Sequence, residues 1–149
     1  ISAFSNIHHG GLIMMKARQE FQSARTPLLE DFKGRYIVRL IIPLFPPIRI
    51  LGHFKFFPDR VMEEGGGYNC FLGFIKIGNF RVDKGASETG DGEEVVKIIY
   101  DAKANPFYIR PLVDELKQTG KDRYIGRGIY RFRNRKRNIF YFTVTRAGS

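Results

Sequence analysis

The fold is decided by residues 48–82, which read IRILGHFKFFPDRVMEEGGGYNCFLGFIKIGNFRV. Two runs in this stretch, 49–57 and 68–77, are rich in aromatic and β-branched residues and predict strands, because such side chains pack well on a pleated surface. Between the two runs, a Pro-Asp pair and the triple glycine 65–67 indicate a turn. The stretch therefore predicts a long β-hairpin. Neither a Lys-Ser/Thr pair nor a helical pattern follows the glycines, so we do not expect a phosphate-binding loop.

The faces of the 49–57 strand differ in character. Alternation places Ile50, Gly52, Phe54 and Phe56 on one face, and we expect this apolar face to point toward a core. The other face is mixed, since it carries Arg49, Leu51, His53, Lys55 and Phe57. A mixed face is typical of a solvent-exposed side or of a lumen that holds a polar group.

The same strand pattern continues on both sides of the hairpin. Short extended runs recur between glycine, proline and polar turns, and we expect strands at 35–42, 49–57, 68–77, 80–82, 95–100, 107–116, 123–132 and 139–145. Regular short strands indicate a mainly β fold, either an up-and-down barrel or a sandwich. We predict an antiparallel up-and-down β-barrel of about eight strands, because closure removes exposed strand edges.

One helix precedes the strands. Residues 12–24 place Met14, Ala17 and Phe21 at helical spacing, and Thr26-Pro27 ends the pattern. We expect residues 1–13 to be a disordered tail or a remnant of a cloning vector, with a native start at Met14 or Met15. Residues 14–149 then form a single β-barrel domain, since a chain of 149 residues buries a real core.

The charge is strongly positive. The 25 Lys and Arg residues outnumber the 15 Asp and Glu residues, which gives a formal net charge of +10. Eight of the basic residues lie between 121 and 137, around a predicted tight turn at 133–138, whereas 83–94 is acidic. We expect 84–94 to be a mobile loop, because its residues are small or polar. A basic hairpin favours polyanions as partners, namely nucleic acid or an anionic surface; the alternative is an ordinary solvated hairpin tip.

Cysteine usage and hydropathy bear on the cellular location of the protein. The single cysteine, Cys70, excludes an internal disulfide, and we see no signal peptide and no transmembrane segment. We therefore expect a cytoplasmic protein. The sequence carries no information on its oligomeric state.

Few residues suggest catalysis. His53 and Cys70 lack an orienting third group, so we expect a buried structural cysteine and a hydrogen-bonded histidine. Asp114 and Glu115 are adjacent on an extended run, and their side chains point to opposite faces, so we expect both at the surface. The sequence nominates no catalytic residue and no metal site, and an enzyme that uses the barrel for a small substrate stays open.

Residues 32–36, Phe-Lys-Gly-Arg-Tyr, resemble the Phe-x-Gly-x-Trp/Tyr opening of calycin-type barrels, which include lipocalins, fatty-acid-binding proteins and nitrobindin-like proteins. The helix ahead of the first strand and the closing segments 124–128 and 141–143 are similar to these barrels as well. The sequence departs from the lipocalin pattern in having no Trp and no later Thr-Asp-Tyr segment. The resemblance implies an apolar ligand in the lumen, with its polar end fixed by arginines and tyrosines. By analogy with nitrobindin-like barrels, haem bound through His53 is a further alternative; no other cofactor is predicted.

Two functions from different classes follow. The first is non-catalytic binding of a small apolar or amphipathic ligand in the lumen, with contacts from Tyr36, Arg39, His53, Lys55, Tyr68, Tyr100, Arg127 and Tyr130. The second is binding of nucleic acid or another polyanion through the C-terminal hairpin, with contacts from Arg131, Arg133, Arg135, Lys136 and Arg137.

Overall fold

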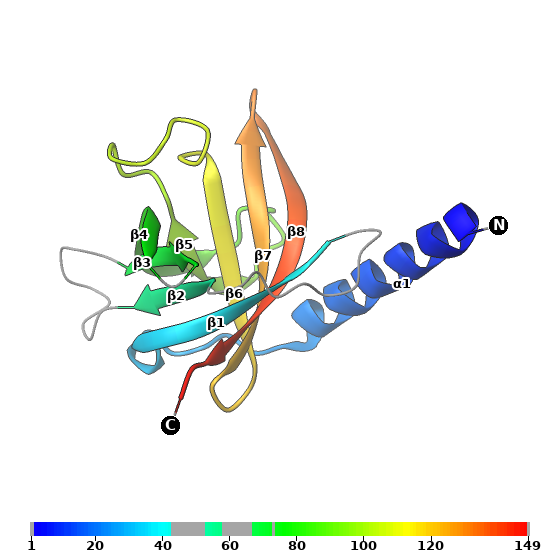
Figure 1. The fold of residues 1–149 in the computed structure, drawn as a ribbon, viewed down its shortest axis with the longest axis horizontal. Coiled ribbons are helices and arrows are strands. Elements are labelled where there is room, and N and C mark those ends of the chain that lie inside the picture. The colour runs from blue at the N-terminus through cyan, green and yellow to red at the C-terminus, as the bar shows by residue number, and fades with distance from the viewer. Residues whose placement is uncertain (1, 43–52, 58–66, 73, 149) are drawn as a thin grey trace.

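The computed structural model is a closed β-barrel with one N-terminal helix (Figure 1). It describes residues 2–42, 53–57, 67–72 and 74–148, and for residues 2–10 and Phe54 it describes the backbone alone. The helical elements are α1 (Ser2–Ser23) and the 3-10 helix η1 (Leu29–Asp31). The strands are β1 (Gly34–Ile41), β2 (Phe54–Phe57), β3 (Gly67–Phe71), β4 (Ile75–Ala86), β5 (Glu94–Ile99), β6 (Leu112–Gly120), β7 (Arg123–Phe132) and β8 (Arg135–Arg146).

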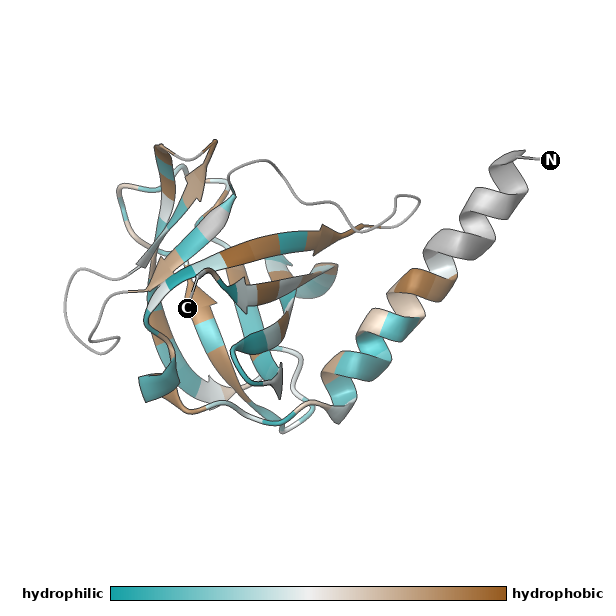
Figure 2. Cartoon of the chain, turned by 60° about the horizontal axis from the view of Figure 1, so that its bottom comes forward, coloured by the Kyte–Doolittle hydropathy of each residue, from teal (hydrophilic) through white to brown (hydrophobic). Residues whose placement is uncertain are grey.

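Each strand pairs antiparallel with the next along the chain, and β8 pairs with β1 to close the barrel. The predicted eight-stranded up-and-down barrel with one N-terminal helix is therefore confirmed. Hydrophilic and hydrophobic residues alternate along the strands, as the bands in Figure 2 show. Inward positions carry most of the apolar core, because successive strand side chains point to opposite faces of the sheet.

Several element bounds differ from the sequence-based expectation. The helix begins at Ser2 rather than at residue 12. β4 runs through Gly78, which lies between the strands expected at 68–77 and 80–82; Gly78 has a positive φ of 67°, and the pairing with β3 shifts register there. β6 starts five residues later than expected, because turns of the backbone occupy residues 106–111. Residues 43–52, 58–66 and 73 lie outside the described residues.

One end of the barrel is closed by aromatic side chains. Phe32, just after η1, is fully buried, and its ring centroid lies 4.5 Å from that of Tyr124 and 5.3 Å from that of Phe57. Tyr36 joins the cluster, and its hydroxyl donates a hydrogen bond to the Asp31 carbonyl at 3.1 Å. Gly34 lies between Phe32 and Tyr36 at a φ of +86°, a conformation that favours glycine. The Phe-x-Gly-x-Tyr segment thus turns the chain from the end of the barrel into β1.

A glycine also shapes the wall. Gly126 on β7 lies opposite Phe142 on β8, and a Cβ atom at Gly126 would lie 2.3 Å from the Phe142 ring. Phe142 is 1% exposed. The glycine therefore lets the ring lie against β7 in the interior.

The C-terminal part of α1 packs against the outside of the barrel, and the rest of the helix projects beyond it (Figure 1). Ala17 and Phe21 are buried against the outward-facing side chains of Ile125 and Tyr141, and Val95 belongs to the same cluster. This is the second, smaller core of the protein. No helix in the described part of the chain is both long and apolar enough to cross a membrane.

Candidate ligand-binding cavity and the basic hairpin at its mouth

The aromatic cluster of Phe32, Tyr36, Phe57 and Tyr124, here called the aromatic plug, closes one end of the barrel. A cavity of about 360 Å³ opens at the opposite end. Its walls are formed largely by apolar side chains, among them Val38, Leu40, Ile42, Phe71, Leu112 and Phe142. Three inward-facing residues, one just before β2 and two on it, lie at increasing distance from the open end of the cavity. His53 lies toward the open end, Lys55 lies deeper, and Phe57 belongs to the plug. The volume lies at the lower end of the range for small-molecule sites.

Four polar side chains form the floor of the cavity. The Lys55 Nζ donates hydrogen bonds to Asn69 Oδ1 at 2.7 Å and to the Tyr100 hydroxyl at 2.6 Å, and it pairs with Asp114 Oδ2 at 3.2 Å. The Tyr100 hydroxyl in turn donates to Asp114 Oδ2 at 2.8 Å. All three N–H groups of the ammonium therefore have acceptors, and the two charges cancel.

The fold explains why these four residues meet. Lys55, Asn69 and Asp114 lie on β2, β3 and β6, and Tyr100 directly follows β5; all four residues line the cavity. Lys55 and Asn69 are direct cross-strand partners in the β2–β3 hairpin. The side chains of Lys55 and Asp114 are only 5% and 3% exposed. A buried charge of this kind persists only when it is paired and hydrogen-bonded.

Burial sets the protonation of the network. Desolvation lowers the pKa of Lys55, and the neighbouring Asp114 carboxylate opposes this shift. Desolvation also raises the pKa of Tyr100 well above its ordinary value, and the Asp114 charge adds to the rise. Tyr100 consequently stays protonated and acts as a hydrogen-bond donor to Asp114.

Two groups beside the cavity have unused hydrogen-bonding capacity. Among the described residues, the two ring nitrogens of His53 and the Oδ1 atom of Asp114 have no hydrogen-bond partner. The expected hydrogen bond of the histidine is not made within the described ranges, and the imidazole stacks on Phe71, with ring centroids 4.3 Å apart. Desolvation and the nearby Lys55 charge lower the pKa of His53 from 6.5 to about 4, against a smaller opposing effect of Asn69.

The face of the β2 segment that points inward is the mixed one. His53 and Lys55 line the cavity, whereas Phe56 is half-buried on the outer side and stacks on Tyr68 at 5.1 Å between centroids. The expectation that the Phe56 face points to the core is wrong. The Asp114 carboxylate is the physical reason, since it offers the buried lysine a counter-charge that no local pattern in β2 reveals. Cys70 neighbours Asn69 on β3 and so lies on the opposite face from the cavity.

The structure separates the residues expected to contact a ligand. Three of them, His53, Lys55 and Tyr100, line the cavity. The others lie elsewhere: Tyr36 in the aromatic plug, Arg39 exposed on the outside, Tyr68 half-buried on the outside, Arg127 on the outer face of β7, and Tyr130 at the mouth. Asn69 and Asp114 are cavity residues that sequence reasoning missed. The signal that could have identified Asn69 is the register of the β2–β3 hairpin, which places Asn69 directly opposite Lys55.

A second buried polar cluster lies outside the barrel, beside α1. Arg127 Nε donates to Glu115 Oε1 at 2.9 Å, and the guanidinium carbon lies 4.2 Å from the centroid of the Phe21 ring. Ser87 Oγ and the Glu88 backbone N–H also donate to the Glu115 carboxylate, at 2.8 and 2.6 Å.

This cluster corrects two expectations. Asp114 and Glu115 do point to opposite faces, as expected, yet both are buried. The loop after β4 covers Glu115 on the outside, and Asp114 lies inside the barrel. The sequence predicts a mobile loop at residues 84–94. The structure instead places 84–86 in β4 and Glu94 in β5, and the loop 87–93 between them is anchored to Glu115 and Arg127. Charges distant in sequence supply this anchor.

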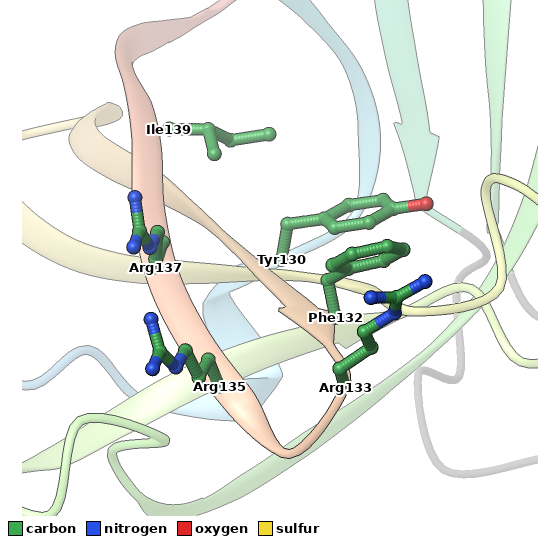
Figure 3. A pocket seen from close by; sticks show the side chains of 6 residues that line it. All are labelled: Tyr130, Phe132, Arg133, Arg135, Arg137 and Ile139. Carbon is green, nitrogen blue, oxygen red and sulfur yellow. The ribbon is translucent and has the colours of Figure 1, made fainter.

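At the barrel mouth, the β7–β8 hairpin forms an open basic pocket of about 580 Å³ (Figure 3). Its lining residues are Tyr130, Phe132, Arg133, Arg135, Arg137 and Ile139. Tyr130 and Phe132 lie side by side on one arm of the hairpin, and Arg135 and Arg137 follow each other on the other arm (Figure 3). Ile139 lines this pocket and the barrel cavity alike, so the two are adjacent.

The basic residues of the hairpin have different surroundings. Lys136 Nζ lies 2.6 Å from Glu88 Oε2, and Arg131 lies 3.6 Å from the same atom. The acidic loop and the basic hairpin therefore meet. Arg133, Arg135 and Arg137 line the open pocket instead, and in the described part of the chain no ion pair engages them. These three arginines are the hairpin residues that remain available to an anion.

Comparison with known proteins supports the fold. No protein-family model matches the sequence, and no curated protein matches it. The structure is similar to the crystal structure of a protein from Thermomonospora curvata, with a TM-score of 0.57 and 15% sequence identity over 97% of this chain and 99% of that chain. At this identity the likeness shows a shared fold: the chain is an eight-stranded antiparallel barrel of the same architecture along almost its whole length.

Proposed function

We propose that the protein binds, without catalysis, a small and mainly apolar molecule inside the barrel. The observation that carries this proposal is a cavity with apolar walls that is open at one end and has a buried Lys-Asn-Tyr-Asp network at its floor. Apolar walls with a few polar groups at fixed positions are the usual composition of a ligand site. The calycin-like segment 32–36 is consistent with such a role, and we propose the cytoplasm as its location. Haem ligation through His53 stays a prediction.

The state of the floor favours binding over chemistry. All three N–H groups of Lys55 have acceptors inside the protein and Asp114 supplies a counter-charge, so the side chain is fully engaged within the floor even though burial lowers its pKa. Burial holds the Tyr100 phenol in its protonated form. The network is therefore suited to orient a polar group of a ligand.

A cavity-filling substitution tests this function. Leu112→Phe places extra volume in the cavity, whereas Val113→Phe, one residue along β6, places it on the outer face and serves as the matched control. We expect wild type and Val113→Phe to bind the neutral apolar dye Nile red, measured by its fluorescence, and Leu112→Phe to bind it at least about tenfold more weakly. Equal binding by both variants, with folding verified by circular dichroism, would contradict a ligand site in the lumen.

A second candidate function is binding of a polyanion at the hairpin. It is favoured by the three arginines that line the open pocket without an ion-pair partner among the described residues, and by Phe132, which is 63% exposed beside Arg133. Cations that follow a nucleic-acid backbone, together with exposed aromatic rings on which bases stack, are the usual elements of a single-strand binding surface.

Two double variants that each remove two positive charges, one at each end of the barrel, test whether the basic pocket binds a polyanion. Arg135→Gln/Arg137→Gln removes two charges at the basic pocket, and Lys121→Gln/Arg123→Gln removes two at the opposite end. We expect the first pair to reduce the affinity for a single-stranded oligonucleotide about tenfold at low salt, and the second to leave it within about twofold, by fluorescence anisotropy. Binding that is absent in wild type, or that weakens equally in both pairs, argues for a solvated hairpin with ordinary surface charge.

A further inference from the structure

Two buried side chains that line the cavity carry polar atoms without a hydrogen-bond partner among the described residues. Asp114 Oδ2 accepts from Tyr100 and pairs with Lys55, but Asp114 Oδ1 has no partner in the described part of the chain, although the residue is 98% buried. His53 is 92% buried and lines the same cavity, and neither of its ring nitrogens has a partner within the described ranges. Buried polar atoms are nearly always satisfied, so an acceptor of this kind calls for a donor from a bound molecule.

The charges of the floor restrict what that donor can be. Every N–H of Lys55 already has an acceptor inside the protein, and its charge is balanced by Asp114. A ligand carboxylate would meet the free Asp114 oxygen as a like charge, without a free cation in the floor to compensate it. A ligand ammonium would suit Asp114 but would add a second cation beside Lys55 in an apolar cavity.

We propose that the bound molecule presents a neutral hydroxyl group to Asp114 Oδ1, so that the ligand class is an apolar alcohol rather than a fatty acid or an amine. A hydroxyl donates to one acceptor and accepts from one donor, which matches the free carboxylate oxygen and the neutral imidazole of His53. This inference rests on the proposed function, because it specifies the ligand of the same cavity.

Displacement of Nile red by four molecules of similar length tests the inference: decanol, nonyl methyl ether, decanoate and decylamine. The ether has the same number of heavy atoms as decanol but lacks the O–H donor, so it isolates the hydrogen bond to Asp114. We expect decanol to displace the dye at a concentration at least about tenfold below that of each of the other three. In the double variant Lys55→Met/Asp114→Leu, which replaces the pair with apolar groups, we expect the ether to match decanol.

The possible outcomes distinguish a wrong ligand class from the absence of a ligand site in the barrel. Equal displacement by decanol and the ether, or tighter binding of decanoate, overturns the hydroxyl inference while the cavity still binds. A preference for decanol that survives in the double variant also overturns it, since Asp114 would then not be the acceptor. Failure of Nile red and of all four molecules to bind wild type overturns the proposed function, and this inference with it.

Discussion

Lys55→Met is expected to lower the free energy of unfolding by about 3–5 kcal/mol, measured by urea denaturation at neutral pH. Methionine approximates the length of the lysine stem but removes the ammonium. The substitution leaves the buried Asp114 carboxylate without its counter-charge, and among the described residues the Tyr100 hydroxyl is then its one side-chain donor. An unpaired buried charge is among the few mechanisms that give a single substitution so large an effect.

The double variant Lys55→Met/Asp114→Leu shows whether the loss comes from the unpaired charge. Replacement of a buried ion pair by apolar groups of similar volume is often neutral or stabilising, so we expect the second substitution to recover most of the lost stability. The surface pair of Arg81 and Asp101 is a matched control, since its atoms are 3.1 Å apart but its side chains are 57% and 55% exposed. Arg81→Met is expected to cost less than about 1 kcal/mol. An equally small loss for Lys55→Met would mean that water or ions reach the floor of the cavity.

Sequence patterns predicted the barrel but only part of the site. The strands from β5 to β8 and the N-terminal helix follow from periodicity, turn residues and a proline boundary, all of which are local signals. No local sequence signal shows which face of β2 points into the barrel. Apolar residues normally identify the core-facing side, and here the inward side contains a lysine that is stabilised by Asp114, 59 residues further along the chain (114 − 55). Such a pairing is visible only once the barrel places β2 and β6 on one lumen.

The acidic loop illustrates the same limit. Its composition of small and polar residues is typical of a mobile segment, and nothing near it in sequence indicates an anchor. The anchor is Glu115, which the strand pattern alone would place at the surface, together with Arg127 from the next strand. Conversely, the positions of Arg133, Arg135 and Arg137 at an exposed hairpin tip could be predicted, because the turn and the alternation on either side of it are local.

His53 is expected to make the protein less stable in mild acid. Its pKa falls from 6.5 to about 4 in the folded state, chiefly through burial and then through the Lys55 charge, so the unfolded chain binds a proton that the folded chain rejects. Stability is therefore complete above pH 6.5 and is lost as the pH falls from 6.5 toward 4. The contribution of this one residue amounts to about 2–3 kcal/mol.

The comparison with His53→Phe isolates this contribution from the carboxylates that titrate in the same range. Phenylalanine can keep the ring stacked on Phe71 but does not titrate. We expect the difference in free energy of unfolding, variant minus wild type, to grow in favour of the variant by about 2–3 kcal/mol between about pH 7.5 and about pH 4, measured by urea denaturation. If the two stability curves run parallel over this interval, the imidazole takes up its proton equally in both states. The cavity mouth would then be polar enough to solvate a cation, and the neutral character assigned to this end of the site would be wrong.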